Sequence, residues 1–263
     1  MTDGGPALEP AHRQAGHRVR LEWGPTGAAA LADDADVAVV VDVLSFTTTL
    51  TVALDRGTTV LPFRWRDERA AAYAEEHDAV LAVGRLEARR DGAGSGVSLS
   101  PAAMASVSGV ERLVLPSPNG SAISFGLREA GCTVVGASLR NAGAVGRWLA
   151  PRVAAGAVVA VCPAGERWPD GSLRPAVEDL WGAGAVLATL GRHADLSPEA
   201  RMAVAAWRAV RDRLADALLG CASGRELVDR DFRADVQVAA AHDTSHVVPV
   251  LAGDRFVAAG EAD

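Results

Sequence analysis

An aspartate interrupts the most apolar run of the chain. Asp42 lies within Val37–Val43 (VAVVVDV), which is nearly continuous valine. Burying a carboxylate there is costly unless it is paired or binds a metal. Two interpretations stay open: Asp42 caps the next helix through the amides of Ser45 or Phe46, or it is a Mg²⁺ ligand or a general acid or base. The threonines that begin at Thr47 favour the second, because amides and hydroxyls at a helix N-terminus form a natural anion site.

A second polar segment, residues 116–121 (PSPNGS), follows an apolar run and precedes a helical one. Its two prolines stiffen the turn, and Gly120 lets a ligand approach the backbone closely. Asn119 and Ser121 add hydrogen-bonding groups. The pattern favours a phosphate-binding turn, and a purely structural turn between a strand and a helix is about equally compatible with it.

Acidic residues mark a third segment. Residues 162–166 (CPAGE) again follow an apolar run, and Glu178 and Asp179 come later on a predicted helix. Adjacent helical residues point about 100° apart, so the two carboxylates cannot share one face, and one could face the cleft and the other the solvent. Oxygen ligands of this kind suit Mg²⁺, which takes one or two carboxylates and keeps several waters. Zinc is not expected, because the six histidines are dispersed and pair with no cysteine at ligand spacing.

The elements that must position these residues alternate along the chain. Strands are expected at 37–43, 58–63, 79–83, 112–115, 133–135 and 157–162, and helices at 46–56, 67–77, 121–130, 141–153, 175–191, 198–219 and 235–241. Residues 85–101, rich in Gly, Ser and Arg, are expected to form a long loop. This alternation predicts an α/β fold, a three-layer α/β/α sandwich with a mostly parallel or mixed central sheet. Ligands of such sheets bind beyond the carboxyl ends of the strands, where the three polar segments fall.

Composition narrows the organisation and the partners. Residues 1–17 are polar and are expected to form a flexible tail, and residues 18–263 a single domain that the Gly-rich loop could divide into two lobes. The net charge of −7 and the scattered arginines argue against nucleic acid and favour a small anionic phosphorylated metabolite. Neither a membrane span nor a signal peptide is visible. Three widely spaced cysteines are typical of a cytoplasmic protein, and a homodimer is compatible with the size.

With these segments in hand, the chain resembles the 2-phosphosulfolactate phosphatase family over roughly residues 18–258. The similar segments, in order, are VVVDVLSFTTTLTVALDRGTTVLPF, LPSPNGSAI, VVGASLRNAGAVGRWL, AVVAVCPAGERWPDGSLRPAVEDLWGAGAVLATL and SGRELVDRDFRADVQVAAAHDTSHVVPVL. The resemblance implies Mg²⁺-dependent removal of phosphate from 2-phospho-3-sulfolactate, a step of coenzyme M biosynthesis. Carried over by position, it implies the site residues Asp42, Asn119, Gly120, Asn141, Glu178 and Asp179.

The chain also departs from that family's pattern. Ser45 stands where the family usually has an arginine, and Gly84-Arg85-Leu86-Glu87 stands where it has Gly-Glu-Arg. Leu99-Ser100-Pro101 replaces Asn-Ser-Pro, and Ser121 replaces the threonine of an Asn-Gly-Thr turn. An arginine and a carboxylate that should contact substrate are therefore missing or moved. Side chains of the loop could compensate: Arg85, Glu87, Arg89 or Arg90.

Two hypotheses of different classes follow. In the first, the protein is a Mg²⁺-dependent phosphatase in which Asp42 with Glu178 or Asp179 holds the metal and water is the nucleophile. Asn119 and the amides at Gly120 and Ser121 then cradle the phosphoryl oxygens, and loop arginines such as Arg85 hold a second anionic group. In the second, it is a weakened relative that binds a phosphorylated metabolite or a protein partner. A nucleotide-binding Rossmann enzyme is disfavoured, because no G-x-G-x-x-G follows the first strand.

Overall fold

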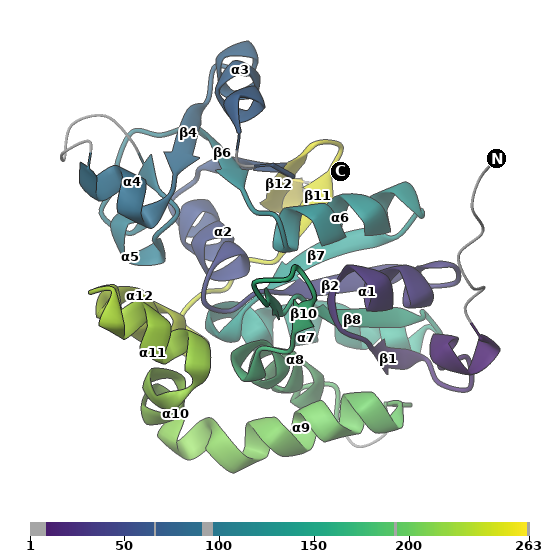
Figure 1. The fold of residues 1–263 in the computed structure, drawn as a ribbon. Helices are drawn as coiled ribbons and strands as arrows, with labels where there is room; N and C mark the ends of the chain where they lie inside the picture. Colours follow the sequence, from purple (N-terminus) through teal and green to yellow (C-terminus); the bar gives the residue numbers. More distant parts are fainter. Residues whose placement is uncertain (1–8, 66, 91–96, 192–193, 262–263) are drawn as a thin grey trace.

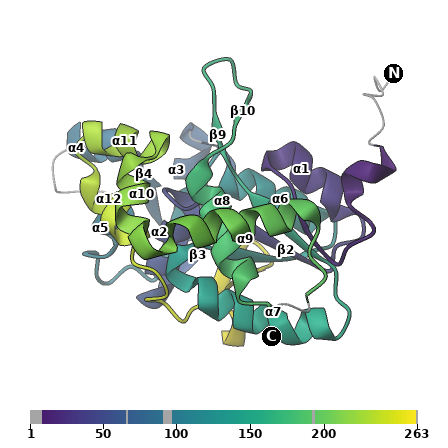
Figure 2. The same cartoon turned by 90° about the horizontal axis from the view of Figure 1, so that it is seen from below.

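The structure is a computed structural model that describes residues 9–65, 67–90, 97–191 and 194–261. Its sheet strands are β1 (Val19–Leu21), β2 (Val37–Val41), β3 (Thr59–Phe63), β4 (Val80–Val83), β5 (Val97–Ser98), β6 (Arg112–Pro116), β7 (Thr133–Ala137), β8 (Val159–Pro163), β11 (Pro249–Ala252) and β12 (Arg255–Ala258). A separate hairpin comprises β9 (Glu166–Arg167) and β10 (Leu173–Arg174). It stands out from the body of the molecule (Figure 2).

Helices flank this sheet in the order α1 (Gly24–Ala32), α2 (Phe46–Asp55), α3 (Glu68–Glu76), α4 (Arg85–Arg90), α5 (Pro101–Met104), α6 (Gly120–Glu129), α7 (Ala142–Ala154), α8 (Val177–Ala188), α9 (Pro198–Val210), α10 (Leu214–Gly220), α11 (Ala222–Asp229) and α12 (Arg233–Ala239). Four 3₁₀ turns complete the described part: Pro10–Arg13, Leu139–Asn141, Arg211–Arg213 and Ala259–Glu261. None of the helices in these ranges is both long and apolar enough to cross a membrane.

The sheet consists of two parallel blocks. Its order is β1-β8-β2-β7-β11-β12-β3-β6-β4-β5, and the antiparallel pair β11–β12 joins the block that ends at β7 to the block that begins at β3. Strands pair in parallel within each block. The prediction of a mostly parallel or mixed sheet in an α/β fold is confirmed (Figure 1). Three antiparallel steps separate β7 from β3, so the two blocks run in opposite directions. Within each block, ligands of a parallel sheet are expected beyond the carboxyl ends of its strands.

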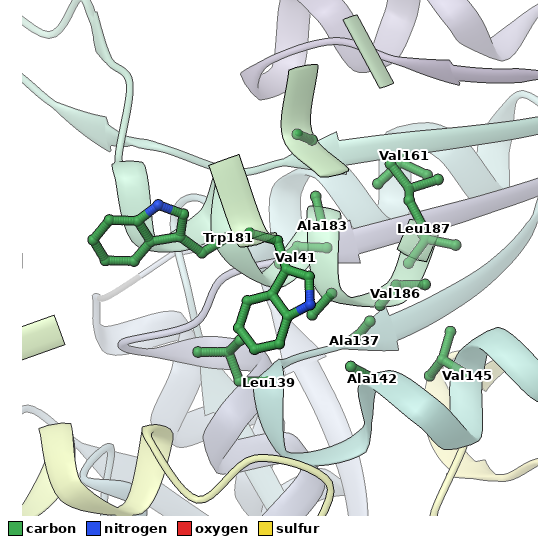
Figure 3. Close-up of a cluster of buried hydrophobic side chains, with 14 of the residues drawn as sticks. Val41, Ala137, Leu139, Ala142, Val145, Val161, Trp181, Ala183, Val186 and Leu187 are labelled. Atoms are coloured by element: carbon green, nitrogen blue, oxygen red, sulfur yellow. The ribbon is translucent and has the colours of Figure 1, made fainter. Parts of the chain in front are cut away.

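The valine run explains how β2 lies at the centre of this fold. Successive side chains of a strand point to opposite faces. Val39 and Val41 pack into a cluster with helices α7, α8 and α9, whereas Ala38 and Val40 pack on the opposite face with α1, α2 and α6. Both faces of β2 are thus covered by helices, as continuous apolar runs predict. Figure 3 shows part of the first cluster around Val41.

Several sequence-based expectations are corrected. The segment 85–101 is not one loop, because α4 begins at Arg85 and β5 and α5 follow the undescribed residues 91–96. The helix expected over 198–219 is divided by a 3₁₀ turn between α9 and α10. Sequence patterns also predicted no element between residues 18 and 36, where β1 and α1 lie.

The expected N-terminal tail is described only in part. Residues 1–8 lie outside the described residues, and a 3₁₀ turn occupies Pro10–Arg13. The side chain of Gln14 donates to the carbonyl of Leu21 at 2.8 Å and accepts from its amide at 3.2 Å. These two bonds fasten residue 14 to strand β1.

Candidate active site

A polar cavity of about 300 Å³ is lined by segments that follow three strands of the sheet. Residues that follow β2, β6 and β8 contribute to its wall, and α4 and α11 close it. The lining residues are Asp42, Leu44, Ser45, Arg85, Ser117, Pro118, Asn119, Glu166, Arg167, Ser223, Glu226, Leu227 and Arg230. Segments that follow strands of both blocks therefore line one polar cavity, although the two blocks run in opposite directions.

The turn between β2 and α2 places Asp42 in the wall. The hydroxyl of Thr47 accepts a hydrogen bond from the Asp42 amide at 2.9 Å and donates one to the Asp42 carbonyl at 2.7 Å. Thr48 donates to the Val43 carbonyl at 2.6 Å. The threonines of this helix start are fully buried, and these bonds satisfy backbone groups of the turn. Their role is thus to fix the backbone that carries Asp42.

Asp179, in the first turn of α8, ties two turns of the site together. One carboxylate oxygen accepts from the Val43 amide at 2.7 Å, and the other accepts from the Gly165 amide at 2.9 Å. Val43 follows β2 and Gly165 follows β8, so one side chain holds both segments in register. Gly165 has a φ of +67°, a conformation that glycine adopts without strain.

Negative charge is concentrated behind the wall. Burial raises the pKa of Asp179 well above its usual value, and the nearby carboxylates Asp42 and Glu178 raise it further. Burial and then Glu178 also raise the pKa of Glu166. The thiol of Cys221 lies beside the same group: burial, followed by Glu178, raises its pKa to about 12. Asp42, Glu178 and Asp179 are each at most 6% exposed, so solvent screens this charge poorly.

Arginines supply the opposite charge on the cavity wall. Arg85 donates from Nε to Asp235 at 2.6 Å and from its terminal nitrogen to the Leu44 carbonyl at 2.9 Å. Arg167, on the hairpin, donates to the Asn119 side-chain oxygen at 3.1 Å. Asn119 in turn donates to the Gly165 carbonyl at 3.2 Å. The Asn119 carboxamide thus orients Arg167 at the cavity.

Helix α11 contributes one face to the site. Ser223, Glu226, Leu227 and Arg230 are spaced three, four and seven residues from the first, so they lie on one side of a helix. Arg230 pairs with Glu226 at 2.9 Å. Arg174 of the hairpin reaches the Ser223 hydroxyl at 3.4 Å. These contacts join the hairpin to α11 across the cavity.

The structure brings some of the predicted site residues together. Asp42, Asn119 and Arg85 line the cavity, and Glu178 and Asp179 lie buried near Asp42. Both Asp179 and Glu178 are buried, so the expectation that one of them faces the solvent is wrong. The catalytic, substrate-binding and metal-binding roles of these residues stay predictions.

Four other predicted substrate contacts lie outside the lining and bond to other protein groups. One is Thr47, described above. The Gly120 amide donates to the Ser117 hydroxyl at 3.0 Å, and a side chain at Gly120 would meet the ring of Phe46 at 2.4 Å. The Ser121 hydroxyl donates to the Leu115 carbonyl at 3.3 Å. Close packing of α6 against α2 therefore accounts for the glycine.

Asn141 is the fourth. It is fully buried, its side-chain oxygen accepts from the Ser138 amide at 2.8 Å, and its nitrogen donates to the Val247 carbonyl at 3.1 Å. These bonds hold the turn after β7 against the segment that leads into β11. In this structure the side chain of Asn141 therefore supports the backbone.

The carboxylates fit a hard cation by their chemistry. Among the described residues, no three His, Cys, Asp or Glu side chains form a group placed to hold a metal ion. Mg²⁺, however, commonly takes one or two carboxylates and fills its other positions with water and substrate phosphate. Asp42 and Glu178 would supply such a pair, and a cation would offset the negative charge that, after burial, raises the pKa of Asp179.

Sequence reasoning missed most of the α11 face and the hairpin base. The residues that it did not assign are Ser117, Glu166, Arg167, Ser223, Glu226 and Arg230. Two of them, Ser117 and Glu166, lie in polar segments that were singled out. The helical spacing from Ser223 to Arg230 was a usable signal, because polar residues there recur at one helical face.

The mostly parallel α/β fold places the buried Asp42 and the three arginines Arg85, Arg167 and Arg230 around one polar cavity, and arginines are suited to binding small anions. The chain belongs to the 2-phosphosulpholactate phosphatase family, whose model matches residues 27–254. It is 35% identical over 222 residues to a probable 2-phosphosulfolactate phosphatase of Thermus thermophilus, covering 83% of this chain and 89% of that protein. A protein of the same name from Deinococcus radiodurans is 32% identical over 231 residues, with coverage of 86% and 91%.

Proposed function

We propose that this chain is a Mg²⁺-dependent phosphatase that hydrolyses a small anionic phosphate monoester similar to 2-phosphosulfolactate. One observation carries the proposal: the buried carboxylate of Asp42, with Glu178 and Asp179 buried behind it, and arginine side chains meet at a single polar cavity. Membership of the family and the names of the two relatives support the reaction type. Three free cysteines fit action in the reducing cytoplasm.

In this proposal Asp42 and Glu178 hold Mg²⁺. The ion, when bound, neutralises charge on the phosphoryl oxygens, which is the main requirement of phosphoryl transfer. Asp179 keeps its two hydrogen bonds to the backbone and so fixes the turns that carry the ligands. Its role is to position Asp42 and the segment after β8.

The protein's cations and amides orient the ester. Arg167, held by Asn119, faces the cavity from the hairpin and would donate two hydrogen bonds to phosphoryl oxygens. Arg85 would add positive charge from α4. A water molecule is the proposed nucleophile: among the described residues that line the cavity there are serines but no histidine to activate them.

Phosphate release from a panel of esters, measured with Mg²⁺ and with EDTA, tests the proposal. Asp42→Asn should lower kcat by at least about 100-fold while the protein stays folded, because the variant loses the charge that holds the cation. Asp212→Asn, at a side chain that is 89% exposed, is the matched control and should keep wild-type turnover. Normal activity of Asp42→Asn would refute the metal assignment.

The alternative is a weakened relative that binds a phosphorylated metabolite or a partner protein without turnover. Ser45 in place of the family's arginine, at the cavity wall, favours it. Metabolite-dependent stabilisation against heat with no phosphate released from any ester would support this alternative and refute the phosphatase.

A further inference from the structure

A second and larger cavity borders the candidate active site. Its volume is about 740 Å³, and it lies between α3, β4, α4 and the segment from α11 to α12. Arg85, Leu227 and Arg230 line both cavities. A ligand bound in the first cavity therefore has a neighbouring space into which part of it can extend.

The two cavities differ in chemical character. Charged and hydroxyl groups dominate the wall of the first, whereas the second is bounded mainly by apolar side chains. Those apolar residues are Ala70, Ala71, Leu81, Leu86, Leu99 and Phe232. Concave apolar surface beside a few convergent polar groups is the usual form of a site for an organic ligand.

Charge around the second cavity disfavours a further anionic group. Asp67, Glu68 and Glu87 line it. Of the two arginines at the border, Arg85 pairs with the buried Asp235 at 2.6 Å and Arg230 pairs with Glu226 at 2.9 Å. Both guanidinium groups already face a carboxylate, which lowers the favourable energy of their interaction with a second anion.

Ser45 adds to this. It lies in the wall of the first cavity, where it supplies a small neutral hydroxyl. The site thus offers cations enough for a phosphoryl group and few for a strongly charged substituent beside it, while apolar surface lies next to it.

We propose that the organic group of the substrate extends from the phosphoryl site into the second cavity, so that the enzyme prefers phosphate monoesters with an apolar group the size of a ring over those with a sulfonate. The proposal rests on the phosphatase function above: it keeps the phosphorylated hydroxy-acid core that 2-phosphosulfolactate shares with its analogues and replaces the sulfonate by an apolar group. Arg85, whose guanidinium lies 6.0 Å from the ring of Phe232, marks the boundary between the two parts of the ligand.

Three esters with one common core test the proposal: 2-phospholactate, 2-phospho-3-sulfolactate and 2-phospho-3-phenyllactate. They differ only in the substituent at the third carbon. We expect kcat/KM for the phenyl ester to exceed that for phospholactate by about tenfold or more, because the ring leaves water for an apolar wall. The sulfonated ester should be the poorest of the three.

A matched pair of variants locates the effect. Ala71 and Ala72 are both exposed on α3, but only Ala71 lines the second cavity. Ala71→Phe should fill part of that space and lower kcat/KM for the phenyl ester about tenfold, which removes its advantage over phospholactate. Ala72→Phe should leave all three values as in the wild type.

The outcomes distinguish failure of the proposed substrate class from failure of the phosphatase function. Release from the esters without preference for the ring, preference for the sulfonated ester, or a phenyl preference that Ala71→Phe leaves intact would each overturn the substrate class and spare the phosphatase. No release from any of the three would overturn the phosphatase function itself.

Discussion

Removing the carboxylate of Asp235 should cost the protein much of its stability and displace Arg85. Asp235 lies on α12 with a side chain that is 2% exposed, and it accepts from Arg85 Nε at 2.6 Å. It also accepts from the hydroxyl of Ser100 and from the Ala102 amide at 3.2 Å. One carboxylate thus joins α12 to α4 and α5, on the side of the cavity where Arg85 lies.

The magnitude follows from these partners. Asp235→Asn keeps the shape and an acceptor oxygen but loses the charge facing a guanidinium that is only 15% exposed. Hydrogen bonds to charged groups contribute about 1.5–3 kcal/mol, so we expect a loss of that size. Asp235→Ala removes every acceptor and leaves Arg85 buried without its carboxylate, which costs about 3–5 kcal/mol.

Urea unfolding, followed by tryptophan fluorescence, measures these losses. Asp212→Ala is the control, and it should change the free energy of unfolding by less than about 0.5 kcal/mol because its side chain is exposed. Combining Asp235→Ala with Arg85→Met should cost less than the sum of the two single changes, by about 1–3 kcal/mol. A cost below about 1 kcal/mol for Asp235→Ala, or strictly additive losses, would refute this reasoning.

Two further predictions concern packing and pH. At Gly184 an added Cβ would lie 2.0 Å from the Ala203 carbonyl oxygen. Gly184→Ala should therefore force α8 and α9 apart and lower the urea midpoint of unfolding sharply. Gly126→Ala is the control: an added Cβ there would have no atom within 4 Å, so the urea midpoint should rise slightly. Hydrogen bonds from Arg20 hold the pKa of Asp34 below its usual 3.8. The stability that this pair contributes is present above pH 3.8 and is lost as the pH falls through the folded-state pKa. The difference between wild type and Asp34→Asn should therefore shrink on acidification, and a difference that is the same at pH 3 and pH 6 would contradict it.

Much of the fold could be predicted from valine runs and helical stretches, because strands buried on both faces leave a strong signal. The early elements β1 and α1 could not, since the Gly-Pro-Thr-Gly sequence at 24–27 has the composition of a turn. The 3₁₀ turn Arg211–Arg213, which separates α9 from α10, contains no Gly or Pro that would predict a helix end. The hairpin strands β9 and β10 have two residues each, too few for any period to appear.

Site residues that directly follow a strand could be predicted from the sequence, whereas the role of residues that depends on tertiary contacts could not. The topological rule led to Asp42 and Asn119, because both come after a strand's carboxyl end. It also led to Thr47 and Ser121, whose hydroxyls serve backbone carbonyls instead. A sequence records that a hydroxyl is present, and only the fold decides whether it turns to a ligand or to the nearest carbonyl.

Asp179 shows why spacing alone could not give the arrangement of the carboxylates. Its two oxygens bind amides that lie 136 and 14 residues away, one after β2 and one after β8. The two hydrogen bonds from backbone amides favour the charged form of the Asp179 carboxylate. Burial and the nearby Asp42 and Glu178 favour its protonated form. If the proposed cation binds, it would favour the charged form of Asp179, and the residue that organises the two turns would then couple their geometry to metal binding.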